Sequence, residues 1–162
     1  MPETALSALM GMMIGAGDID ELVSGLDWPM HQALRELYEE AGRVGATDRL
    51  PTTSFRPYPG VAWRADGADE ALWELRVKGL LVPRGSGLTG KLVVNDDLRG
   101  RHRRDLLRLG LPVSELVYRA GVRWAALAAT AAKNWVTVEG SAGSQVSAGT
   151  PAVLQSSRSG RR

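Results

Sequence analysis

Residues 68–95 read ADEALWELRVKGLLVPRGSGLTGKLVVN and divide into a helix, a strand, a glycine-rich tip and a second strand. The first part keeps an apolar stripe at helical spacing and is followed by Gly79 as a C-terminal cap, which predicts a helix over 68–78. Segments 80–84 and 91–95 are short apolar runs on either side of the glycine-rich tip. The stretch therefore predicts a helix that leads directly into a β-hairpin.

This order of elements, a helix ending in Lys-Gly-Leu-Leu followed by a hairpin with a flexible basic tip, resembles the recognition helix and wing of winged-helix proteins. The resemblance covers residues 68–95 and rests on element order and turn chemistry. It implies a winged-helix-like core. It also implies that a basic wing would lie along the phosphate backbone of a nucleic acid.

The segments upstream are predicted as two further helices and a loop. Asp18 is expected to cap a short helix over 19–26, and a longer amphipathic helix follows over 28–41. Residues 46–67 are rich in proline and aromatic side chains, which predicts a long ordered loop with a strand near 61–63.

Two helices are predicted downstream, over 96–109 and over 113–135. The expected fold is therefore mainly α with a small β-hairpin (α+β), a winged-helix-like core plus C-terminal helices. A single globular domain is expected over 1–136. Residues 137–162 contain few large apolar side chains and are predicted to form a flexible Ser/Gly-rich tail.

The composition excludes several kinds of chemistry. The chain has 162 residues and no cysteine, so disulfides, thiol nucleophiles and cysteine-ligated metals are excluded. Its two histidines, His31 and His102, lie in no HxH or HExxH motif and form no recognisable metal site or catalytic dyad. We therefore expect a protein that is not an enzyme, with no cofactor and no metal.

The hydropathy pattern does not predict a membrane protein. The apolar stretch 5–17 lacks the basic residues that begin a signal peptide, and no later segment reaches eighteen apolar residues without a charge. We expect a bacterial cytoplasmic protein with no membrane partner.

Charge is distributed unevenly along the chain. Residues 1–42 hold eight acids and one base, whereas residues 76–123 hold eleven bases and four acids. A basic cluster of this kind is typical of proteins with an anionic partner, and DNA is the partner that it favours. The residues expected to contact nucleic acid are Arg76, Lys78, Arg84, Lys91, Arg99, Arg101, Arg103, Arg104 and Arg108.

Three alternatives to DNA binding stay open. The arginine content also fits the composition bias of a high-GC bacterial genome, and the arginines also fit a solvated helix face. The predicted recognition helix carries Asp69, Glu70 and Glu74, which repel phosphates. The third alternative is therefore an adaptor subunit whose winged-helix core docks on another protein.

The helix over 113–135 is predicted to be the interface of a homodimer. Its apolar stripe is longer than a domain of this size needs, and small residues along it allow close helix approach. The alternative is that the helix closes the core of its own chain. The predicted dimer contacts are Leu116, Ala120, Trp124 and Leu127.

Residues 85–91, GSGLTGK, match the first seven positions of the phosphate-binding GxxxxGK motif. The eighth residue is Leu92 rather than Ser or Thr, and the apolar run that follows favours a strand instead of the helix that a phosphate site needs. The segment is therefore predicted as a hairpin tip and not as a nucleotide site.

The remaining polar and aromatic candidates are predicted to be structural. Asp66, Asp69, Asp96 and Asp97 lie beside predicted helix starts, where short acidic side chains accept hydrogen bonds from free backbone N–H groups. Aromatic side chains at amphipathic-helix positions are expected in the core or in an interface. They are Trp28, Tyr38, Trp63, Trp73, Trp124 and Trp135.

Overall fold

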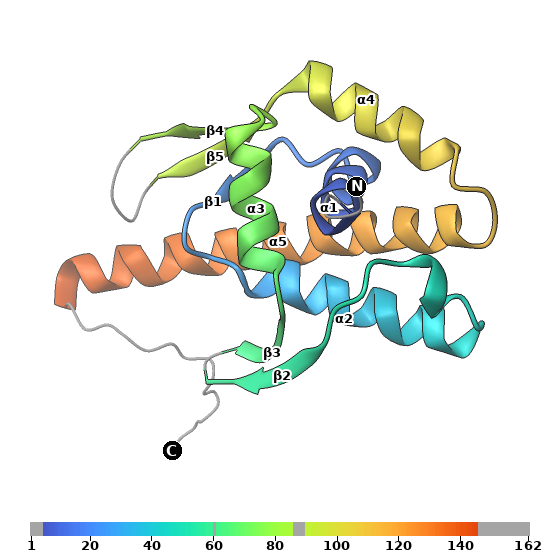
Figure 1. Ribbon diagram of the computed structural model, residues 1–162. Coiled ribbons are helices and arrows are strands. Elements are labelled where there is room, and N and C mark those ends of the chain that lie inside the picture. Colours follow the sequence, from blue (N-terminus) through green and yellow to red (C-terminus); the bar gives the residue numbers. More distant parts are fainter. Residues whose placement is uncertain (1–4, 60, 86–89, 146–162) are drawn as a thin grey trace. The chain divides into compact units, whose positions relative to one another are not determined.

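The computed structural model describes residues 5–59, 61–85 and 90–145, which form a mainly helical α+β fold (Figure 1). This confirms the fold class expected from the sequence. The helices are α1 (Ala5–Ala16), α2 (Trp28–Arg43), the 3-10 helix η2 (Thr47–Arg49), α3 (Ala68–Val77), α4 (Asp96–Leu107) and α5 (Val113–Gln145). The strands are β1 (Glu21–Val23), β2 (Phe55–Tyr58), β3 (Val61–Ala65), β4 (Leu81–Arg84) and β5 (Lys91–Val94).

The predicted helix and hairpin over 68–95 are present as α3, β4 and β5, and β1 completes a three-stranded antiparallel sheet in the order β1-β5-β4. Leu22 pairs with Leu92, and Leu81 pairs with Val94, and all four side chains are buried. Lys91 starts β5 and is exposed. The alternation along β5 gives the sheet one face on the core and one outer face. This arrangement is compatible with a winged-helix-like core.

Strand β1 replaces the short helix that was predicted over 19–26, and that prediction is wrong. Asp18 has a left-handed backbone (φ 52°) and ends α1 instead of starting a new helix. The backbone N–H of Ile19 donates to the carbonyl of Ile14, which satisfies a free carbonyl of the last turn of α1. The residues that follow are then free to pair with β5.

The predicted loop over 46–67 contains a second sheet, the antiparallel hairpin of β2 and β3. Its β3 strand confirms the strand expected near 61–63. The hairpin packs on α2, where the guanidinium of Arg35 lies 3.5 Å from the ring centroid of Trp63. The hydroxyl of Tyr38 also donates a hydrogen bond to the carbonyl of Pro51. Aromatic and proline residues therefore order this segment through packing on α2.

Helix α1 belongs to the core, and Figure 1 shows it nearly end-on, with α4 above it, α3 beside it and α5 below it. Its glycines allow neighbouring helices to approach closely. A Cβ on Gly11 would lie within 2.8 Å of the ring of His102, and one on Gly15 would lie 3.0 Å from a backbone oxygen of α4. On α5, a Cβ on Gly121 would overlap the carbonyl oxygen of Met13. Small residues at these contacts therefore determine where α4 and α5 pack.

The chain divides into two compact units, Met1–Ala128 and Ala129–Arg162, with the boundary inside α5. The hydrophobic core described above belongs to the first unit. In the second unit α5 continues to Gln145, so residues 137–145 are helical, whereas the sequence predicted a flexible tail there. The rest of the predicted tail, 146–162, lies outside the described residues.

The close contact at Gly121 predicts how a substitution there changes the free energy of unfolding. Gly121→Ala should lower the free energy of unfolding by about 1–3 kcal/mol, because the added methyl group meets backbone that no rotamer change can move. Gly100→Ala on α4 is the matched control, since its nearest neighbour is the end of a flexible arginine at 4.0 Å. Better helix propensity should raise stability there by up to about 1 kcal/mol. Urea unfolding of both variants measures the difference, and equal effects would contradict this packing.

Candidate functional site

Two of the arginines predicted to bind DNA hold α4 against the turn that follows α1. Arg99 is only 15% exposed, and it forms ion pairs with Asp20, at 2.6 Å, and with Asp96. It also donates to a backbone carbonyl of that turn, and the hydrogen bond to Asp20 raises the pKa of its guanidinium. Arg103 pairs with Asp18 and donates to the last turn of α1. These side chains are occupied in the fold itself.

Most of the other predicted DNA contacts also have partners within the described residues. Lys78 lies 3.8 Å from Glu74, Lys91 lies 3.0 Å from Glu21 across the sheet, Arg108 lies 3.4 Å from Asp105, and Arg76 lies over Trp73. By contrast, Arg84, Arg101 and Arg104 are exposed and form no ion pair with a described residue. Three of the nine cations therefore have no ion-pair or ring partner in the part of the chain that the structure describes.

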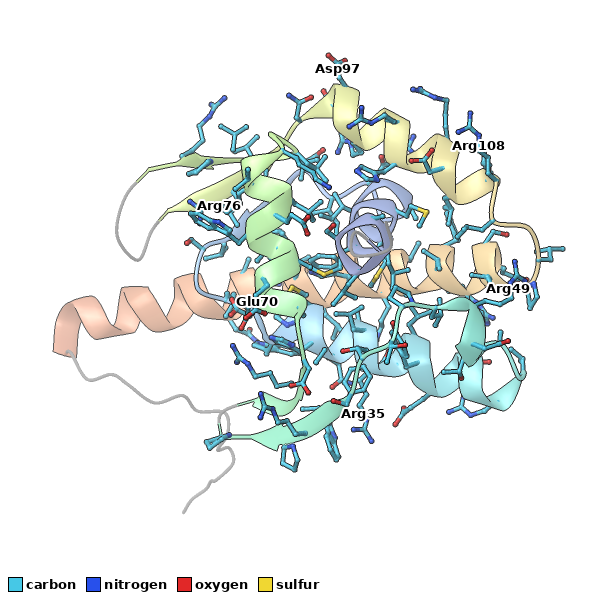
Figure 2. All side chains as sticks on the ribbon, in the orientation of Figure 1. Arg35, Arg49, Glu70, Arg76, Asp97 and Arg108 are labelled. Atoms are coloured by element: carbon cyan, nitrogen blue, oxygen red, sulfur yellow. The ribbon has the colours of Figure 1, made fainter. Side chains whose placement is uncertain are left out.

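The outer face of α3 is apolar and acidic. Trp73 is 58% exposed and Val77 is 70% exposed, and they lie one turn apart on the same side of the helix as exposed Glu70. Figure 2 shows Glu70 near the start of α3 and Arg76 near its end. Strand β4 packs on α3 and exposes Val82. We define Glu70, Trp73, Val77 and Val82 as the α3 face.

Trp73 is held in place on this surface. The guanidinium of Arg76 lies 4.7 Å from the centroid of the Trp73 ring, in cation–π geometry. This contact favours one orientation of the indole, while more than half of the residue stays open to solvent. Tryptophan and arginine are the residue types that most often anchor protein interfaces, and a side chain ordered in advance loses less entropy on binding.

A buried polar cluster that the sequence did not predict joins α2, β3 and α3. His31 is fully buried, its Nδ1 accepts a hydrogen bond from the backbone N–H of Ala65 at 3.1 Å, and its Nε2 lies 3.5 Å from Asp69. Asp69 is ion-paired with Arg64, and Asp27 lies within 4.8 Å of both His31 and Asp69. Asp69 therefore contacts side chains, and it does not take the capping role expected of it.

The other expected caps are also corrected. Gly67, with φ 85°, is the N-cap of α3, and Asp66 instead pairs with Arg56. At α4 the cap is Asn95, whose side-chain oxygen accepts from the N–H of Asp97.

The hydrogen bond that His31 accepts from Ala65 disfavours metal binding by this cluster. Because Nδ1 accepts from an N–H group, the proton of the neutral ring lies on Nε2, and a protonated nitrogen cannot coordinate a cation. The guanidinium of Arg64 would also repel a cation at Asp69. Because Nδ1 accepts the Ala65 N–H and Nε2 carries the ring proton, neither nitrogen offers a free lone pair for a general base in this arrangement. Its role is to connect three elements.

The predicted dimer contacts on α5 pack in the core of a single chain. Leu116, Ala120 and Trp124 are at most 6% exposed and belong to the core cluster, and Leu127 is half-buried. These buried side chains are not available on an outer face, so α5 closes the core of its own chain through them. The exposed side of α5 carries other residues, Tyr118 and Val122 among them.

Local patterns in the sequence could have identified part of this site. Trp73 and Val77 fall outside the apolar stripe of α3, which is the signal that they face solvent, although the tryptophans were expected in the core or an interface. Trp124 is in the core. The His31 cluster had no local signal, because its members come from three elements that are distant in sequence.

Comparisons of the chain with protein-family models, with curated proteins and with solved structures give no match. None of the described helices has both the length and the apolar character needed to cross a membrane.

Different arginines on α4 should contribute differently to stability. Arg99→Ala should lower the free energy of unfolding by about 1–2 kcal/mol, because it leaves a backbone carbonyl and exposed carboxylates without their partner. Arg101→Ala should change it by less than about 0.5 kcal/mol, as at other exposed sites. Chemical denaturation of the two variants tests this, and a neutral Arg99→Ala would show that Arg99 is free for another role.

Proposed function

We propose that this chain is a protein-docking adaptor with a winged-helix-like core and no catalytic role of its own. Helix α3 and the β4–β5 hairpin take the places of the recognition helix and the wing in the resemblance carried by residues 68–95. The hairpin joins β1 in a sheet whose inner face rests on the core. The β2–β3 hairpin is an insertion between α2 and α3.

The observation that carries this proposal is the exposure of Trp73 and Val77 on α3, at 58% and 70%. A helix that enters a DNA groove neutralises phosphates and reads base edges with polar and cationic side chains. The helix instead presents the Trp73 indole, Val77 and the carboxylate of Glu70, and Val82 lies on the neighbouring strand β4, which suits a protein surface.

The charges near this face indicate the chemistry of the partner. Glu70 is exposed and forms no ion pair with a described residue, whereas Glu74 is paired with Lys78. A partner segment that presents apolar side chains to Trp73 and Val77 and a cation to Glu70 would match the α3 face.

DNA-backbone contact is the second candidate function, and the exposed cations Arg84, Arg101 and Arg104 favour it. Such contact would be independent of sequence and weakened steeply by salt. It would use the wing and α4 and leave the α3 face uncovered.

A random-peptide phage library tests the docking proposal without a known partner. Selection on the full chain should enrich peptides that combine apolar residues with Lys or Arg. Trp73→Ala should weaken the binding of these peptides by about 30-fold, which corresponds to the ~2 kcal/mol of an anchor residue. Tyr118→Ala is the control, since Tyr118 is a similarly exposed aromatic residue on α5.

The same variants also give the results that would contradict the docking proposal. Enriched peptides that bind Trp73→Ala as tightly as they bind the unmodified chain would place docking elsewhere. Fluorescence anisotropy with a labelled DNA duplex at low salt is the parallel measurement. Tight binding that Trp73→Ala leaves unchanged and that alanine at Arg84, Arg101 and Arg104 abolishes would assign the function to DNA instead.

A further inference from the structure

The inserted β2–β3 hairpin is held at its α3 end by the buried His31, beside the ion pair of Arg64 with Asp69. Ala65 is the last residue of β3, and its backbone N–H donates to Nδ1 of His31. Gly67 then begins α3 in a left-handed conformation, and Asp69 in the first turn faces Nε2 of the same ring. One imidazole therefore contacts both the end of the hairpin and the start of α3.

The charged groups around His31 come from each of these elements. Asp27 precedes α2, Arg64 is on β3 and Asp69 is on α3. The ion pair between Arg64 and Asp69 offsets part of the attraction that the carboxylate would exert on a protonated ring. Burial and then Arg64 lower the pKa of His31, and the charge of Asp27 opposes them.

A proton on His31 is incompatible with the hydrogen bond to Ala65. The neutral ring already carries its proton on Nε2, so a second proton must bind Nδ1, the atom that accepts the Ala65 N–H. The two N–H groups would then point at each other, and both need a new acceptor. Separation of β3 from α2 lets water supply it.

We propose that His31 is a proton-operated latch, so that protonation releases the end of β3 from α2 and loosens the first turn of α3. This inference holds whether or not the α3 face docks a protein, since it concerns only how α3 is anchored. Trp73 lies one turn after Asp69, so the released segment leads directly into the α3 face.

The opening is local because other contacts hold the rest of the hairpin. Arg35 stacks on Trp63, and burial raises the pKa of Tyr38, whose hydroxyl donates to the carbonyl of Pro51. These contacts keep the middle of β3, and the segment that leads into β2, on α2. The segment released from α2 runs from Ala65 to the start of α3, and it stays joined to the β2 side by the hydrogen bond from the Asp66 N–H to the carbonyl of Ser54.

The sign and size of the effect follow from proton linkage. The closed state resists protonation and the open state titrates near 6.5, so acid favours the open state. Between pH 7 and pH 5 the ratio of open to closed molecules should rise by about 25-fold, if the closed state stays unprotonated over that range.

Nuclear magnetic resonance of the full chain tests the latch. At pH 7, long-range 1H–15N spectra should show His31 with its proton on Nε2. Between pH 7 and pH 5 the amide signals of residues 64–69 should shift together with the protonation of this ring. His31→Asn places an uncharged oxygen near the position of Nδ1 and should remove the transition, whereas His102→Asn should retain it.

Two results would overturn the proposal. One is an Nδ1–H tautomer in the unmodified chain at pH 7, which needs no variant to fold. The other is a transition at residues 64–69 that persists in His31→Asn. If His31→Asn does not fold, the unmodified chain decides the question. A pH midpoint of the amide shifts of residues 64–69 that differs from the pH midpoint of the His31 ring would exclude the latch.

Discussion

The close approach of helix backbones around α1 is the constraint on which the rest of this fold depends. Gly11 and Gly15 leave room for α4, and Gly121 leaves room for α1 against α5. Because α4 is held there, the turn after α1 lies beside Arg99 and Arg103, and β1 reaches β5. The sheet and α3 then pack on the same core. A methyl group at Gly121 would overlap the backbone of α1, one at Gly15 would press on the backbone of α4, and one at Gly11 would push on the His102 ring.

The uneven charge of the sequence has an internal explanation. Acids near the N-terminus pair with bases further along the chain: Asp20 with Arg99, Asp18 with Arg103, and Glu21 with Lys91. On the helices, Glu36 pairs with Arg123, which lowers the pKa of that carboxyl below its usual range. The basic stretch therefore complements an acidic stretch of the same chain. Exposed pairs of this type add little stability each.

Patterns of neighbouring residues were enough to predict the elements whose formation depends on neighbouring residues. Helix α3, the β4–β5 hairpin and α4 follow from spacing, glycine positions and turn residues within 68–109. Strand β1 was missed because its three residues become a strand only by pairing with β5, some seventy positions away. The His31 cluster was missed for the same reason, since Asp69 and Ala65 reach His31 only through tertiary packing. Exposure at Trp73 could be inferred from its place outside the α3 stripe, whereas the sequence pattern predicted the tryptophans in the core or in an interface and did not separate the two.

The proposed docking role depends on an exposed indole on α3, because six of the nine cations predicted to bind DNA have partners within the fold. The most direct measurement is the relaxation enhancement of the tryptophan indole signals by a soluble paramagnetic agent. We expect strong enhancement for Trp73, which is 58% exposed, and protection for Trp124, which is 1% exposed. Protection of Trp73 to the same degree as Trp124 would show that α3 presents no exposed indole and would rule out docking through Trp73.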